Sequence, residues 1–194
     1  MHPFPPTCLN FSPGLILIFL LLPARLTAQK SIELVKFDLP PVIDGAVDEA
    51  IWESAEPVTE FIQREPHTGQ PISVHTEVYV GYDENNLYNG FRCYTDPKEI
   101  TSKELARDVS LGPDDRVQVM LDTYHDRRNA YWFQVGPRGS IGDAMVSENG
   151  ASFNKAWDGL WTGKAKIHKK GWDAEFAIPF KTLRFSEGQE SWGI

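Results

Sequence analysis

Short runs of alternating apolar and polar residues recur between residues 76 and 178, and this pattern most restricts the possible fold. Successive side chains of a strand point to opposite faces, so alternation with period two predicts strands that bury one face. The runs cover residues 76–82, 87–94, 116–122, 130–135, 140–147, 161–168 and 172–178. Turn residues at 83–86 and 169–171 separate neighbouring runs and favour hairpins. The sequence therefore predicts an all-β fold, an antiparallel, jelly-roll-like β-sandwich.

Helical signals are short and lie outside the predicted strands. Asp48 is placed to cap a turn that ends near Trp52. Pro97 opens a predicted helix that runs to Leu105. Residues 191–194 have the character of a strand that is just beginning. We therefore expect a sandwich truncated at its C-terminal strands, with unpaired backbone groups along one edge.

An uninterrupted apolar run at residues 15–22 predicts an export signal at the start of the chain. The run is shorter than the roughly 20 residues that a membrane-spanning helix needs. Ala28 is a small residue at the expected cleavage position. We expect residues 1–28 to be a signal peptide and residues 29–194 to be one domain. An uncleaved membrane anchor is the alternative.

The charge balance argues against a nucleic-acid partner. The chain has 19 Lys and Arg residues against 27 Asp and Glu residues, a net charge of -8. Phosphate binding needs clustered positive charge, and the one basic cluster, residues 164–170, spans a predicted strand end and turn. Cys93 would be the only cysteine left after cleavage, so we expect a buried core thiol and no internal disulfide.

Two neighbouring predicted strands, 116–122 and 130–135, offer a candidate carbohydrate-binding surface. Their aliphatic side chains must face the core, which leaves Gln118, Met120, Trp132 and Gln134 on the outward face. An indole can stack on the C–H side of a sugar ring, while carboxamides bond its hydroxyl groups. The alternative is that another layer of the sandwich covers Trp132.

The phrase Trp-Asp-Gly-Leu-Trp at 157–161 is a second candidate. Asp158 precedes a glycine and signals a turn, so Trp157 and Trp161 flank a loop. One indole would stack on a ligand while Asp158 bonds it. The alternative places both tryptophans in the end of the core.

Carboxylates gather at predicted strand ends and loops, where Ca²⁺ finds oxygen ligands. They are Asp114, Asp115, Asp122, Asp126, Asp143, Glu148 and Asp158. No compact calcium-binding loop is present, so solvated turn carboxylates are the alternative. We expect ion pairs that tie loops together, formed by Arg107 and Asp108, by Arg116 and by the charged residues at 125–128.

Paired acids also raise the question of catalysis. Asp173 and Glu175 share one strand face at a separation of about 7 Å, a distance that glycosidases use. Any strand with two alternating acids has that spacing, and nothing in the sequence implies a cleft beside them. We therefore expect no catalytic site in this segment.

Several phrases together resemble family-9-type carbohydrate-binding modules, as found in xylanases and at the N-terminus of uncharacterised bacterial outer-membrane β-barrel proteins. They are Pro-Val-Ile-Asp-Gly at 41–45, and residues 83–88, 114–122, 157–161 and 171–180. The resemblance covers residues 32–194. It implies a β-sandwich, binding of polysaccharide or oligosaccharide, and an association with glycoside hydrolases in xylan-type catabolism. It also implies a periplasmic or outer-membrane location and, from the family, structural Ca²⁺.

The resemblance also implies ligand contacts that this sequence changes. Family members have Trp, Glu and Arg at the positions that we match to Gly112, Gln118 and Gln134, and a second Trp falls beyond Ile194. Our leading hypothesis remains a non-catalytic, exported carbohydrate-binding module. The second is an interaction domain of an outer-membrane β-barrel protein that has lost sugar binding. The third is a haem-binding module, because related sandwiches ligate haem and Met120, Met145 and His125 are available.

Overall fold

A computed structural model describes residues 30–109 and 112–194. The predicted signal peptide, residues 1–28, lies outside the described residues. Residues 33–194 form one compact unit, and the described residues before it, 30–32, form no helix or strand. No helix in the described part of the chain is long and apolar enough to cross a bilayer.

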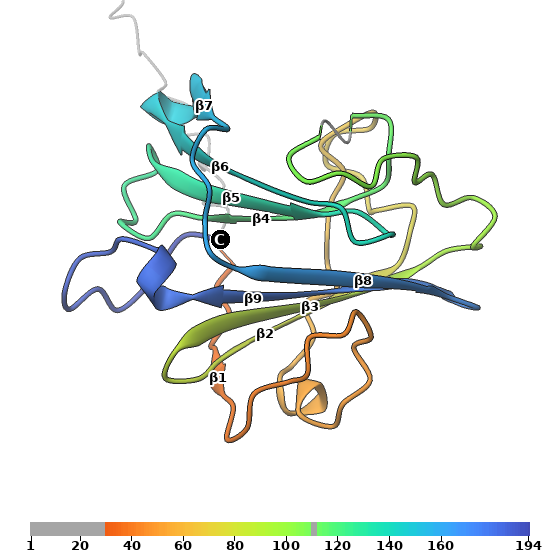
Figure 1. The fold of residues 1–194 in the computed structure, drawn as a ribbon, viewed down its shortest axis with the longest axis horizontal. Coiled ribbons are helices and arrows are strands. Elements are labelled where there is room, and N and C mark those ends of the chain that lie inside the picture. The colour runs from red at the N-terminus through yellow and green to blue at the C-terminus, as the bar shows by residue number, and fades with distance from the viewer. Residues whose placement is uncertain (1–29, 110–111) are drawn as a thin grey trace, which may run out of the picture. The chain divides into compact units, whose positions relative to one another are not determined.

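The described residues form two β-sheets that stack face to face (Figure 1). The large sheet has the order β1-β2-β3-β9-β8, with β1 Val35–Lys36, β2 Thr76–Tyr82, β3 Asn86–Tyr94, β8 Thr162–His168 and β9 Gly171–Pro179. The small sheet has the order β4-β5-β6-β7, with β4 Val117–Leu121, β5 Ala130–Val135, β6 Ile141–Ser147 and β7 Ser152–Asn154. Among the strands of the described residues, only β1 and β2 pair in parallel. Short 3₁₀ helices are η1 Trp52–Ser54, η2 Glu148–Gly150 and η3 Phe180–Thr182. The predicted antiparallel β-sandwich is confirmed.

The alternating runs in the sequence correspond to strands β2 to β6, β8 and β9. Strands β2 and β5 begin and end at the predicted residues. The helix predicted from Pro97 to Leu105 is wrong, because residues 97–99 form only a turn. The amides of Thr101, Lys103 and Glu104 instead donate to the carboxylates of the Asp114–Asp115 pair. These long-range bonds satisfy N–H groups that a helix would otherwise have used.

The main core lies between the two sheets. Inward-facing residues of β4 and β5, such as Leu121 and Phe133, pack with Phe176 of β9. Full burial of side chains of this size contributes roughly 1.5–3 kcal/mol each. Cys93 belongs to this core, as predicted, and burial raises the pKa of its thiol to about 12. This thiol is therefore a packing residue.

A second core lies on the outer face of the large sheet. The segment 37–55, which we name the strap, crosses this face, below the large sheet in Figure 1. Phe37, Val47 and Trp52 of the strap pack with Tyr79 and Tyr88 of the sheet. The turn predicted to end near Trp52 lies further along the chain, because η1 begins at Trp52. Its N-cap is Ile51 and not Asp48, and no side chain caps it. Because the strap occupies this face, ligands must be sought elsewhere on the sandwich.

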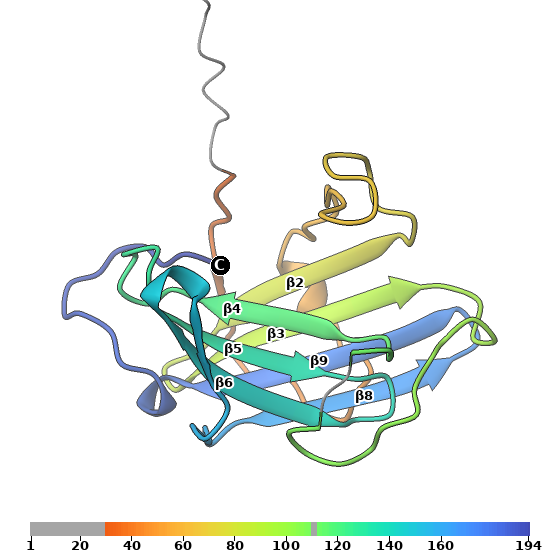
Figure 2. The ribbon, with the colours of Figure 1, turned by 90° about the horizontal axis from the view of Figure 1, so that it is seen from above.

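The outer face of the small sheet is the one seen in Figure 2, with β4, β5 and β6 in front of the large sheet. Residues 191–194 run beside the end of β4. Asp122 and Gly193 form an antiparallel bridge with backbone hydrogen bonds of 2.8 and 2.9 Å. Trp192 packs against Phe180 and Phe185. The strand character expected for this segment is seen at the bridge.

Candidate functional site

Alternate residues of β4 and β5 form the outward face of the small sheet. The strand register places Gln118 opposite Gln134 and Met120 opposite Trp132. A depression of about 180 Å³ lies on this face. Its lining residues are Gly112, Arg116, Gln118, Trp132, Gln134, Phe153 and Lys155. The structure therefore brings three of the six predicted contact residues, Gln118, Trp132 and Gln134, into one pocket.

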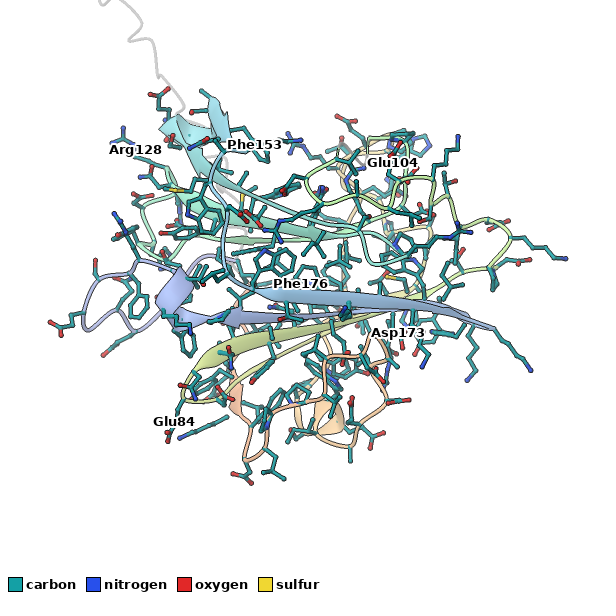
Figure 3. The ribbon with its side chains drawn as sticks, in the orientation of Figure 1. Glu84, Glu104, Arg128, Phe153, Asp173 and Phe176 are labelled. Atoms are coloured by element: carbon teal, nitrogen blue, oxygen red, sulfur yellow. The ribbon has the colours of Figure 1, made fainter. Side chains whose placement is uncertain are left out.

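Trp132 contributes less surface to this pocket than an open sugar-stacking ring would. Its side chain packs with Ala144 and Val146 of β6, and only 8% of the residue is exposed. Phe153 of β7 meets the indole edge-on, with ring centroids 5.0 Å apart. Phe153 is 44% exposed, so a phenyl ring supplements the indole as the apolar part of the pocket (Figure 3).

The two carboxamides differ in mobility. Gln134 is buried, and its Nε2 donates to the carbonyl oxygen of Val109 at 3.4 Å. Its cross-strand neighbour Gly142 makes room for it, because a Cβ at Gly142 would lie 2.8 Å from that nitrogen. Gln118 is exposed. Gln134 is thus fixed in position, whereas the Gln118 side chain can adjust to a ligand.

Two residues of the pocket, Phe153 and Lys155, were not predicted from the sequence. They lie in and directly after β7, a strand of three residues that carries too short a pattern to detect. Arg116 stands at the opposite wall, where its Nη1 donates to the carbonyls of Gly112 and Asp114 at 3.4 and 3.3 Å. The pocket thus combines aromatic, carboxamide and cationic groups.

The second candidate, residues 157–161, lies apart from this pocket. Trp161 stacks on Phe176 at 5.5 Å and meets Phe133 edge-on, while its indole N–H donates to Asp143 at 2.8 Å. Trp157 packs against Tyr131 and Phe133. Both tryptophans therefore close the end of the core, which was the alternative expectation for them.

Asp158 belongs to a charged network at this end of the molecule. It is exposed and pairs with Arg107, which also contacts Asp143 at 2.6 Å and Asp108 at 3.2 Å. Burial raises the pKa of Asp143, and the N–H groups of Trp161 and Gly159 and the Arg107 charge oppose that rise. The expected ion pairs are confirmed for Arg107. Asp158 therefore takes part in an ion pair that holds its loop to the loop of Arg107.

The predicted carboxylate ligands do not gather into a metal site in the described part of the chain. The described ranges contain no group of three or more His, Cys, Asp or Glu residues arranged to hold a metal ion. Asp126, for example, accepts the backbone N–H groups of Arg128 and Asn129. Met120 and Met145 lie on opposite faces of the small sheet, since Met120 pairs with Trp132 and Met145 with Tyr131. Bound calcium stays a prediction.

Asp173 and Glu175 face the strap rather than a cleft. Glu175 is fully buried, and its two oxygens accept N–H groups from Asp44 at 2.9 Å, Gly45 at 2.7 Å and the Trp52 indole at 3.1 Å. Asp173 accepts the amide of Val47 at 3.2 Å. Both acids thus attach the strap to β9. This arrangement leaves no room for a substrate between them.

We expect the stability of the fold to decrease between about pH 5 and about pH 7. Burial raises the pKa of Glu175 from 4.5 to about 7, against the opposing bond from Gly45. Within that window the folded chain holds a proton that the unfolded chain releases, so the free energy of unfolding falls as the pH rises. Urea unfolding at several pH values would measure the slope. The Glu175→Gln variant should show a smaller slope, because the amide does not titrate. An equal slope in both proteins would contradict the assignment.

Comparison with known proteins supports the architecture. No protein-family profile and no curated protein matches the sequence. Two solved structures of a family 9 carbohydrate-binding module from Caldicellulosiruptor kristjanssonii match the fold. The cellotriose complex has a TM-score of 0.53 and 20% identity, over 77% of this chain and 67% of that one. The glucose complex has a TM-score of 0.54 and 20% identity, over 80% and 72%.

A candidate carbohydrate-binding protein from Bacteroides uniformis also matches, with a TM-score of 0.56 and 8% identity. That match covers 77% of this chain and 72% of the other. At these identities the comparison concerns the fold, and it agrees with the resemblance drawn from the sequence phrases. The chain therefore has the β-sandwich fold of the family-9-type carbohydrate-binding modules.

Proposed function

We propose that this chain is a non-catalytic carbohydrate-binding module that acts outside the cytoplasm, in the breakdown of xylan-type polysaccharides. The observation that carries the proposal is the pocket on the outward face of the small sheet, with an indole, a phenyl ring and two carboxamides in its lining. Apolar rings match the C–H face of a sugar and carboxamides match its hydroxyl groups.

The structural neighbours support a sugar ligand. Two of them were solved with cellotriose and with glucose. The pocket here is small, about 180 Å³, and opens on a sheet surface. We therefore expect it to hold one or two sugar units of a chain, with weak affinity.

Isothermal titration of the whole chain with glucose, cellotriose and xylotriose tests this proposal. Gln118→Ala should weaken binding about fivefold, the effect of one lost hydrogen bond of about 1 kcal/mol. Gln118 suits this test because it is exposed and its truncation leaves no buried group unpaired. Gln70→Ala, the same change at an exposed position in the loop before β2, is the control and should bind as the wild type does.

The absence of heat with every neutral and acidic glycan would contradict sugar binding. That result would favour the second candidate, an interaction domain of an outer-membrane protein. The low exposure of Trp132 is the observation that favours this candidate, because a covered indole offers little stacking surface. If Gln118→Ala and Gln70→Ala weakened sugar binding equally, the pocket would not be the binding site.

A further inference from the structure

The charge of the pocket differs from that of the chain as a whole. The chain has a net charge of -8. The pocket lining instead has two cationic residues, Arg116 and Lys155, and no carboxylate among the described residues that form it. A neutral sugar needs no such pair of cations. The local excess of positive charge therefore indicates a ligand with negative charge.

The two cations occupy different walls of the pocket. Arg116 belongs to the segment that leads into β4, where it bonds the carbonyls of Gly112 and Asp114. Lys155 directly follows β7, two residues after Phe153. It is exposed, and it forms no ion pair with any residue that the structure describes. Its ammonium group can therefore turn toward a ligand without breaking an existing pair.

We propose that this pocket prefers acidic sugars, with Lys155 as the residue that recognises the carboxylate of a uronic acid unit. The proposal rests on the proposed sugar-binding function and names the ligand class of the same site. Phe153 and Trp132 would contact the sugar ring while Gln118 bonds hydroxyl groups and Lys155 pairs with the carboxylate. A single sugar unit has both the ring and the charge that this lining matches.

The overall negative charge of the chain does not forbid this preference. At physiological ionic strength, interactions between exposed charges are screened beyond about 8 Å. A carboxylate in the pocket is therefore affected mainly by nearby charges, and the charged residues in the described part of the lining are Arg116 and Lys155. One exposed ion pair changes an affinity by up to about fivefold. A fivefold difference in affinity can be measured, and it should decrease as the salt concentration rises.

The test compares a xylo-oligosaccharide with the same oligosaccharide carrying one glucuronic acid branch. Titrations use the whole chain in about 0.02 M and about 0.5 M NaCl, because salt weakens pairs between exposed charges. At low salt the wild type should bind the acidic sugar about fivefold more tightly than the neutral one. Lys155→Gln should reduce this preference to less than about twofold. The control Lys164→Gln, at an exposed lysine of β8 in the other sheet, should keep it.

The outcomes separate this inference from the function on which it rests. Binding of neither sugar would contradict the proposed function itself. Equal affinity for both sugars, or a preference that survives Lys155→Gln or high salt, would overturn the acidic preference while leaving sugar binding intact. Displacement of the acidic sugar by acetate at the same concentration would also overturn it, since the site would then select any carboxylate.

Discussion

Glu175→Ala is expected to lower the free energy of unfolding by about 3 kcal/mol. The substitution leaves the amides of Asp44 and Gly45 and the Trp52 indole without their acceptor. The bonds from Gly45 and Trp52 are buried, and the bond from Asp44 is part-buried. Each buried donor left unpaired costs about 1–3 kcal/mol, and relaxation of the strap recovers part of the sum. Urea unfolding followed by tryptophan fluorescence would measure the change.

The control for this variant is Glu84→Ala, at the edge of the molecule in Figure 3. The Glu84 side chain is exposed and pairs only loosely with Lys36, at 3.5 Å. Its loss should change stability by less than about 0.5 kcal/mol. A similar small change for Glu175→Ala would show that the strap is not attached through this carboxylate. Glu175→Ala and Glu84→Ala should both keep the sugar affinity of the wild type as long as they fold, because the pocket lies on the other sheet.

Gly171→Ala is expected to destabilise the fold by about 3 kcal/mol or more. Gly171 is the first residue of β9, after the hairpin turn. Its φ angle is +144°, a value that residues other than glycine rarely adopt. A Cβ there would fall on the carbonyl oxygen of Cys93, and it would lie 2.9 Å from the amide nitrogen of Thr95. Both obstacles are backbone atoms, so strands β3 and β9 would have to move apart.

Gly139→Ala is the matched control for this second substitution. Gly139 also has a positive φ angle, +83°, but a Cβ there would meet no atom within 4 Å. It should therefore show the backbone strain alone, about 1 kcal/mol. The difference between the midpoints of the two denaturation curves isolates the steric part. If both variants lose the same stability, the close approach of β3 and β9 at Gly171 is not a constraint.

The strands could be predicted from the sequence because their signal is local. Each alternating run reports one buried face, and the neighbouring turn residues fix its ends, as at β2 and β5. Strands β1 and β7 have only two and three residues, too few for a period to be seen. The predicted helix from Pro97 does not form because of tertiary contacts. The amides of Thr101, Lys103 and Glu104 bond carboxylates 10 to 14 residues further along the chain.

The site was only partly predictable, for the same reason. Strand alternation was enough to place Gln118, Trp132 and Gln134 on one outward face. It could not show that Phe153 covers the indole, because that contact depends on how β7 pairs with β6. The spacing of Asp173 and Glu175 was visible, but the partners of Glu175 lie some 130 residues earlier in the chain.

The strap has one further consequence. Residues 37–55 close one side of the sandwich, and exposed positions alternate with buried positions along β4. The side chains at 118 and 120 therefore take no part in the core. Simultaneous randomisation of positions 118, 120 and 155 should therefore yield mostly folded proteins. Variants that bind chosen glycans could be selected from such a library. Antibodies offer a parallel, because their binding loops vary while the framework stays constant.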